Sequence, residues 1–249
     1  MTWHWRTFFD LSGPELLILL ALLPAVPTPG ATVTGSIHLI ESHDPGVRKN
    51  HDYSGVVIWL ERRAGTPIPI QPKTAQMAQK KKRFVPPVLA VPAGSTVSFP
   101  NFDPIFHNAF SNFAGQVFDV GLYPPGTDQK VRFRQPGIVR VFCNIHPAMS
   151  AVIVVLNTPY MAVSNLDGSF HIGDVEPGEY RLDVFHERAT DQTLSALTRN
   201  LTIGNDPVLL PPLEISESGY IQTPHKNKYG KEYPAVIEDR PAYRPGKQP

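Results

Sequence analysis

The chain contains a single cysteine, Cys143, and lacks long helix-periodic stretches over most of its 249 residues. With one cysteine, no internal disulfide can form. Charge of neither sign is in excess, since 23 Lys and Arg residues stand against 22 Asp and Glu residues, which argues against nucleic acid as the main partner. Many of the 27 prolines and 18 glycines separate short apolar runs. This pattern is typical of a β-protein with many turns.

Residues 1–30 have the character of an export signal. Arg6 supplies positive charge, and an apolar run extends from Leu16 to Val26. The run is shorter than the roughly 20 residues that a membrane span requires. Two carboxylates precede the run and no A-x-A cleavage site follows it, so an uncleaved anchor is the alternative. Both a cleaved signal and an uncleaved anchor predict a periplasmic or otherwise extracytoplasmic protein. Its only membrane contact would be such an anchor.

Alternating or continuous apolar runs predict strands over much of residues 31–203. The clearest runs are residues 31–40, 55–61, 83–91, 96–99, 130–134, 138–142, 151–156, 161–164, 180–186 and 198–203. Periodicity is lost after residue 205, and the proline-rich composition there predicts a flexible tail.

The residues that suggest metal chemistry lie in the loop Cys143–Met149, between two predicted strands. The loop offers a thiolate, the imidazole of His146 and a thioether. One Cys, two His and a weak axial Met form the ligand set of a mononuclear blue-copper site. The second histidine must come from elsewhere, and His107, placed after a different predicted strand, is the best candidate. A cysteine, histidine or methionine of this kind is, taken singly, more often a core or surface residue than a metal ligand. Their combination favours a copper site.

This loop resembles the ligand loop of cupredoxins, the blue type-1 copper proteins, and has the C-x2-H-P-x-M spacing of amicyanin/plastocyanin-like members. Upstream, Phe99–Asn101 and His107–Asn108 resemble the segment that supplies the first histidine of that family. The resemblance spans Phe84 to Leu156 and implies a cupredoxin Greek-key β-sandwich.

The resemblance also implies roles for individual residues. One type-1 copper ion would be bound by His107, Cys143, His146 and Met149. Asn108 would tie the two ligand loops together. Pro147 would shape the loop and limit hydrogen bonding to the thiolate. Asn144 departs from the pattern, and this polar neighbour of the cysteine is expected to alter the surroundings of the metal.

A second resemblance involves the flanking segments. Val163–Phe170, followed by Val175–Tyr180, resembles the carboxypeptidase regulatory-like (transthyretin-like) β-sandwich. The first strands of that family resemble Thr34–Ile37 and Val56–Leu60. Together the two resemblances imply an all-β chain, with a cupredoxin inserted in or appended to this sandwich. Alternatively, the first 60 residues add strands to the cupredoxin.

The implied division of the chain has five parts. They are a signal peptide or anchor (1–30), the first strands of the split sandwich (31–72), the cupredoxin domain (73–157), the remainder of the sandwich (158–215) and a flexible tail (216–249).

These features predict an exported copper protein that transfers electrons by cycling between Cu(II) and Cu(I). We expect a redox partner to dock on the His146 side, where Pro147 and Ala148 would provide an apolar contact. The alternative is a copper storage or delivery protein, or a surface interaction protein, in which the second sandwich is the working module. The sequence shows no open substrate position, so we do not expect an enzyme.

The basic run Lys80–Arg83 is interpreted as a solvated face. Its alternative is a docking patch for an acidic redox partner or a membrane surface. His4 falls in the export segment. Of the other histidines outside the ligand set, we expect surface positions: His38, His43, His51, His171, His186 and His225.

Overall fold

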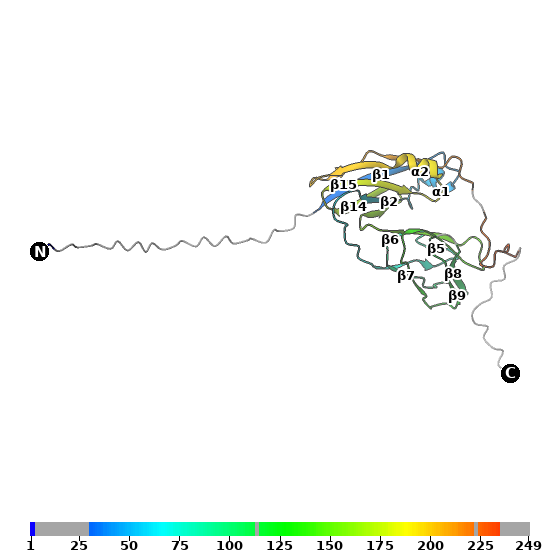
Figure 1. Cartoon of the computed structure of the whole chain (residues 1–249). Coiled ribbons are helices and arrows are strands. Elements are labelled where there is room, and N and C mark those ends of the chain that lie inside the picture. Colours follow the sequence, from blue (N-terminus) through cyan, green and yellow to red (C-terminus); the bar gives the residue numbers. More distant parts are fainter. Residues whose placement is uncertain (3–29, 113–114, 222–223, 235–249) are drawn as a thin grey trace, which may run out of the picture.

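A computed structural model describes residues 1–2, 30–112, 115–221 and 224–234 (Figure 1). Nearly all regular structure in these ranges is β-strand, which confirms the prediction of an all-β chain. Nearly the whole predicted export segment lies outside the described residues. No helix within the described ranges is long and apolar enough to cross a membrane.

Two sheets of four strands each enclose the first apolar core. In one sheet, β1 (Ala31–Ile40) pairs antiparallel with β14 (Ser169–Val175) and parallel with β17 (Val208–Leu209) and β18 (Leu213–Ser216). The other sheet has the order β13 (Met161–Val163), β2 (Val57–Arg62), β15 (Gly178–Phe185) and β16 (Arg199–Ile203). The first two strands of the chain thus pair with strands that lie after residue 160.

Residues 74–156 form the other sheets, which lie side by side with the first two (Figure 1). The largest has the order β6 (Val88–Pro92), β12 (Ser150–Leu156), β11 (Gly137–Phe142), β8 (His107–Ser111) and β9 (Phe118–Tyr123). A smaller one has the order β10 (Lys130–Arg132), β7 (Thr96–Ser98) and β3 (Thr74–Gln76), and β4 (Ala78–Gln79) pairs with β5 (Phe84–Val85). The domain limits expected from the sequence stay predictions.

Strand β12 lies between two apolar clusters, because both of its faces are buried. Its odd-numbered residues from Ala151 to Val155 pack in the core that contains Cys143. Its even-numbered residues from Val152 to Leu156 pack in a third cluster with residues of β2 and β15. A continuous apolar run is what a strand buried on both faces requires. Burial of each Val, Ile or Leu side chain among them contributes about 1.5–3 kcal/mol.

Two short helices interrupt the β-structure. Helix α1 (Pro45–Asn50) begins after Asp44, whose carboxylate accepts hydrogen bonds from the N–H groups of Gly46 and Val47. Helix α2 (Asp191–Leu197) begins after Thr190, whose hydroxyl accepts the N–H of Thr193. Both have an N-cap residue of a favoured type, but neither is long enough to show helical periodicity in the sequence.

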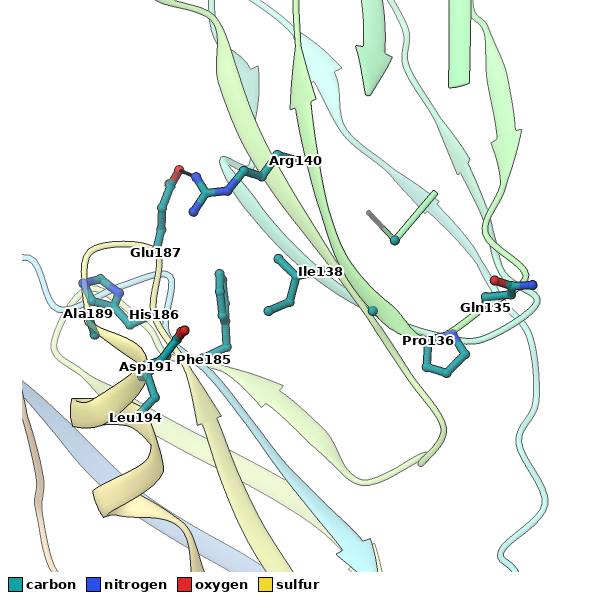
Figure 2. Close-up of a pocket in the computed structure, with 12 residues that line it drawn as sticks. Gln135, Pro136, Ile138, Arg140, Phe185, His186, Glu187, Ala189, Asp191 and Leu194 are labelled. Carbon is teal, nitrogen blue, oxygen red and sulfur yellow. Dashed lines mark hydrogen bonds and ion pairs between the residues drawn. The ribbon is translucent and has the colours of Figure 1, made fainter. Parts of the chain in front are cut away.

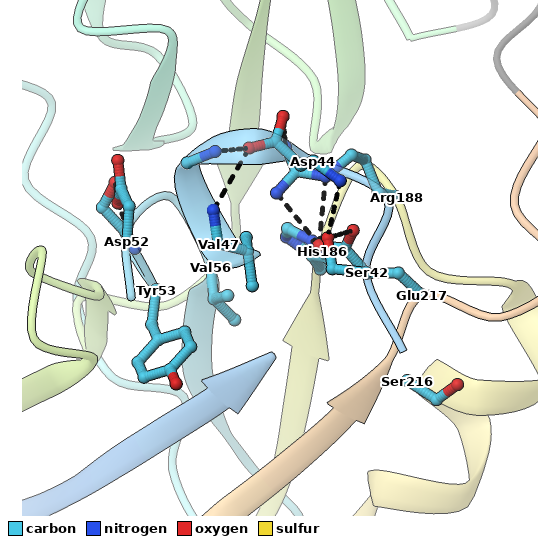
Figure 3. Close-up of polar contacts among 12 residues, drawn as sticks. Ser42, Asp44, Val47, Asp52, Tyr53, Val56, His186, Arg188, Ser216 and Glu217 are labelled. Atoms are coloured by element: carbon cyan, nitrogen blue, oxygen red, sulfur yellow. Dashed lines mark hydrogen bonds and ion pairs between the residues drawn. The ribbon is translucent and has the colours of Figure 1, made fainter. Parts of the chain in front are cut away.

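A buried ionic cluster holds the chain just after β18 (Figure 3). Glu217 is 4% exposed, and its carboxylate lies 2.8 Å from Nε2 of His186 and 2.9 Å from a guanidinium nitrogen of Arg188. The hydroxyl of Ser42 donates to the same carboxylate at 2.5 Å. The region expected to be a flexible tail therefore begins with an anchored residue. The surface placement expected for His186 is also wrong, since it is 3% exposed.

Candidate metal centre

Three side chains converge on one buried point in the core to which β12 contributes its odd-numbered residues. The ligand atoms of His107, Cys143 and His146 all lie within 4.8 Å of one another. Nδ1 of His146 is 3.6 Å from Sγ of Cys143, and Nδ1 of His107 is 3.9 Å from it. His107 and Cys143 are fully buried, and His146 is 5% exposed. Two imidazole nitrogens and one sulfur thus face a site large enough for a single metal ion.

The sheet positions both segments that supply these side chains. His107 is the first residue of β8, whereas the sequence analysis expected it after a strand. Cys143 directly follows β11, which pairs with β8 through Phe142 and Phe110. Because β11 and β12 also pair along their length, both ends of the Cys143–Met149 loop are fixed.

Met149 closes this loop. Its carbonyl accepts the N–H of Cys143 at 3.2 Å, and its own N–H donates to the carbonyl of His146 at 3.0 Å. The side chain is fully buried in the same apolar cluster as Cys143. The fourth predicted ligand therefore lies in the core that surrounds the other three.

Burial raises the pKa of the Cys143 thiol, although backbone N–H groups of Ile145, Asn108 and His146 act in the opposite direction. A bound cation would favour the thiolate and overcome this effect of burial. Pro147, which has no N–H group, adds no further donor near the sulfur.

Asp103 is a site residue that the sequence analysis missed. Its carboxylate lies 2.8 Å from Nε2 of His107 and accepts the N–H groups of Lys81 and Lys82 at 2.5 and 2.7 Å. Burial by itself raises the pKa of Asp103, but the hydrogen bonds from Lys82, His107 and Lys81 outweigh it, so the pKa is lowered. An ionised Asp103 accepts a hydrogen bond from the Nε2–H of His107, which leaves the Nδ1 lone pair of His107 directed at the site. The only signal in the sequence was a carboxylate four residues before His107.

Asn108 connects the two ligand loops. Its Oδ1 accepts the N–H of Asn144 at 3.3 Å, and its Nδ2 donates to Asp119 at 2.7 Å. Asn144, the residue that departs from the family pattern, uses its own Oδ1 to accept the N–H of Lys228 at 3.0 Å. The Lys228 ammonium in turn lies 2.6 Å from Asp119. This ring of contacts brings the C-terminal segment to the metal loop.

Residues 224–234 pack against the outside of the same loop. The hydroxyl of Tyr233 donates to the carbonyl of Cys143 at 2.8 Å. The ring of His225 stacks on Phe142 at a centroid distance of 4.0 Å, and its Nε2 lies 2.8 Å from the carbonyl of Pro147. Residues 224–234, which were expected to belong to a flexible tail, are thus held by side-chain contacts. Pro147 and Ala148 nevertheless remain exposed.

The remaining histidines stay apart from this centre. His38, His43, His51 and His171 are exposed, as the sequence analysis expected. Within the described ranges, the one group of His, Cys, Asp or Glu side chains that could hold a metal is the one around Cys143.

A separate cavity of about 780 Å³ lies between β11 and the residues that follow β15 (Figure 2). Ile138 and Phe185 line it, and Arg140 forms a 3.0 Å ion pair with Glu187 at its edge. None of its lining residues belongs to the His107, Cys143 and His146 cluster.

No family model and no curated protein sequence matches this chain. Among solved structures, a purple cupredoxin from Nitrosopumilus maritimus is similar at 24% identity and a TM-score of 0.30, over 33% of this chain and 99% of its own. A copper-containing nitrite reductase from Thermus scotoductus SA-01 is similar at 23% identity and a TM-score of 0.33, over 48% of this chain and 28% of its own. An oxidized proline-to-alanine variant of amicyanin is similar at 21% identity and a TM-score of 0.32, over 33% of this chain and 82% of its own. Similarity at this level assigns no function.

Proposed function

We propose that this chain is an exported type-1 copper protein that transfers electrons. The observation that carries the proposal is the convergence of Nδ1 of His107, Nδ1 of His146 and Sγ of Cys143 in one buried site. A thiolate with two imidazoles and a weak axial thioether suits copper in both oxidation states. Copper bound there would supply one-electron exchange between Cu(II) and Cu(I).

The residues of the chain prepare this site for rapid electron exchange. Paired strands fix both ends of the ligand loop, so the ligands keep one geometry. Asp103 holds His107 with its Nδ1 toward the sulfur. Burial of the three donor residues excludes water, which limits reorganisation of the surroundings when charge changes.

An electron carrier suits this arrangement better than an enzyme, because no donor side chain is more than 5% exposed. A partner protein can instead approach the loop from outside, where Pro147 and Ala148 are exposed next to His146. We propose that this partner is a redox protein in the periplasm or another extracytoplasmic compartment.

Visible absorption and EPR of the Cu(II)-loaded protein test the proposal. We expect an intense blue thiolate-to-copper band and narrow copper hyperfine splitting, both lost in Cys143→Ala. His107→Ala should also disrupt the signal, while His171→Ala, at an exposed histidine, should leave it unchanged. A colourless protein with ordinary copper signals that are insensitive to Cys143→Ala would refute a type-1 site. Cu(I) transfer to an apo-acceptor without reversible redox cycling would instead indicate storage or delivery.

A further inference from the structure

Four consecutive cations, Lys80 to Arg83, form the turn between β4 and β5. Reciprocal backbone hydrogen bonds of 2.9 and 3.2 Å between Lys80 and Arg83 close this turn. All four residues are exposed. Within the described ranges, no carboxylate side chain forms an ion pair with Lys80, Lys81 or Arg83. The positive charges of Lys80, Lys81 and Arg83 are therefore directed to the solvent.

Local stability does not account for this choice of residues. Lys81 and Lys82 both have a φ of 54°, in the left-handed region that long side chains disfavour. Tight two-residue turns with positive φ are formed most readily by Asn-Gly. Four adjacent like charges also repel one another. Strain of this kind, kept at an exposed position, points to a function for the side chains.

The backbone of the turn is joined directly to the metal centre. The N–H groups of Lys81 and Lys82 donate to the two carboxylate oxygens of Asp103, which lies 2.8 Å from Nε2 of His107. Successive N–H groups that cradle an anion in this way form a compact nest. One carboxylate thus separates the basic turn from a residue that faces Cys143.

Apolar side chains stand beside these charges. Phe102 is 61% exposed, and its N–H donates at 2.8 Å to the carbonyl of Gln79, the residue before the turn. Val85, at the end of β5, is 48% exposed. An aromatic anchor surrounded by polar and charged groups is the usual anatomy of a protein interface.

We propose that Lys80–Arg83, Phe102 and Val85 form a basic docking surface for an acidic electron-transfer protein. The proposal rests on the proposed function and adds a second docking surface, apart from the Pro147 and Ala148 side, from which an electron leaves His107 through Asp103. In each encounter one electron passes from the reduced protein to the oxidised partner, with no bond formed or broken and no proton transferred. Opposite charges steer the partner to the turn and raise the association rate.

Stopped-flow kinetics with the reduced, copper-loaded protein test this surface. The probes are an oxidised acidic c-type cytochrome and, as its opposite-charge counterpart, an oxidised basic mitochondrial-type cytochrome c. We expect the double variant Lys81→Glu with Lys82→Glu to react about tenfold or more slowly with the acidic probe at low salt, and faster with the basic one. Both differences should shrink at about 1 M salt, where charges are screened within a few ångströms. Glutamate keeps the backbone N–H groups that hold Asp103.

The matched control is Arg48→Glu with Lys49→Glu, an equal charge reversal at the exposed end of α1 in the other sandwich. Equal slowing by the control, or no slowing in the turn variant, would overturn the proposal. Binding of the wild type, but not of the turn variant, to phosphatidylserine vesicles would also overturn it if the cytochrome rates were unchanged. The basic turn would then be a membrane surface.

A copper-free measurement separates this proposal from the proposed function. Hexacyanochromate(III), a redox-inert paramagnetic anion, should broaden the amide signals of residues 80–83 and Phe102 in the metal-free protein, and less so in the turn variant. If that broadening occurs but the copper-loaded protein has no Cys143-dependent blue band, the proposed function fails while the anion-binding surface stands. If the blue band is present without the broadening, the docking surface fails alone.

Discussion

The carboxylate of Asp103 lies 2.8 Å from Nε2 of His107, at the opposite edge of the imidazole from the Nδ1 that faces Cys143. This contact fixes both the orientation and the tautomer of the histidine. Carboxylates that hold metal-binding histidines in this way raise ligand basicity and strengthen metal binding. The two lysine N–H groups in turn keep the carboxylate in place.

Asp103→Asn should weaken metal binding. Asparagine keeps the shape of the side chain but has one acceptor oxygen in place of two and carries no charge. We expect Cu(I) affinity to fall by about 10- to 100-fold, measured by competition with a chromophoric Cu(I) chelator. Asp128→Asn, at an exposed carboxylate, should leave the affinity unchanged. Equal Cu(I) affinities in the two variants would show that Asp103 does not support metal binding.

Tyr233→Phe should alter the electronic signature of the site with little loss of stability. Burial raises the pKa of Tyr233, so the hydroxyl keeps the proton that it donates to the carbonyl of Cys143. Loss of this hydrogen bond should shift the thiolate-to-copper band and the reduction potential, and should lower the free energy of unfolding by about 0.5–1.5 kcal/mol. Tyr229→Phe, at a 70% exposed ring in the same segment, is the matched control. Identical spectra in all three proteins would make the contact incidental.

Met149→Leu tests the fourth predicted ligand. The substitution nearly conserves volume and should destabilise the protein by less than about 1.5 kcal/mol. The blue band should persist, because Cys143 and both histidines remain, while loss of the weak axial donor should raise the reduction potential. Met77→Leu is the matched control, since Met77 is fully buried in the same core. Equal potentials in the two variants, measured by protein-film voltammetry, would exclude Met149 as a ligand.

Local patterns predicted the strands and the ligand loop well. The alternation in Ala31–Ile40 became β1 with the same limits, and the apolar run at 151–156 became the doubly buried β12. The short spacing from Cys143 to Met149 placed three of the predicted ligands on one loop. In these segments the signal lies within a few neighbouring residues, which is the range that periodicity and spacing can describe.

The features that the sequence did not predict depend on contacts between distant residues. Tyr233 meets Cys143 across 90 positions, and the carboxylate of Glu217 meets the hydroxyl of Ser42 across 175. Such hydrogen bonds require no periodicity in either segment. A proline-rich composition also looks the same whether the segment is free or held by side-chain contacts. The C-terminal segment was therefore expected to be flexible.

Glu217→Gln should reduce stability at neutral pH. Burial alone would raise the pKa of the Glu217 carboxyl, but hydrogen bonds from His186, Arg188 and Ser42 outweigh it and lower the pKa from 4.5 to about 2. A lowered pKa means that the ionised carboxylate stabilises the fold, by about 3 kcal/mol when it is fully charged in both states. We expect Glu217→Gln to lose most of this free energy of unfolding in urea denaturation at pH 7.

The pH dependence distinguishes this electrostatic effect from a packing defect. The stabilisation by Glu217 is complete above the unfolded-state pKa of 4.5 and is lost as the pH falls toward about 2, where the folded protein also takes up the proton. The difference in stability between wild type and Glu217→Gln should therefore narrow steadily over this interval. Glu214→Gln, at an exposed carboxylate of β18, should match the wild type throughout. If the difference in free energy of unfolding between wild type and Glu217→Gln stays constant from pH 7 to pH 3, Glu217 acts through its shape, because acid removes only its charge.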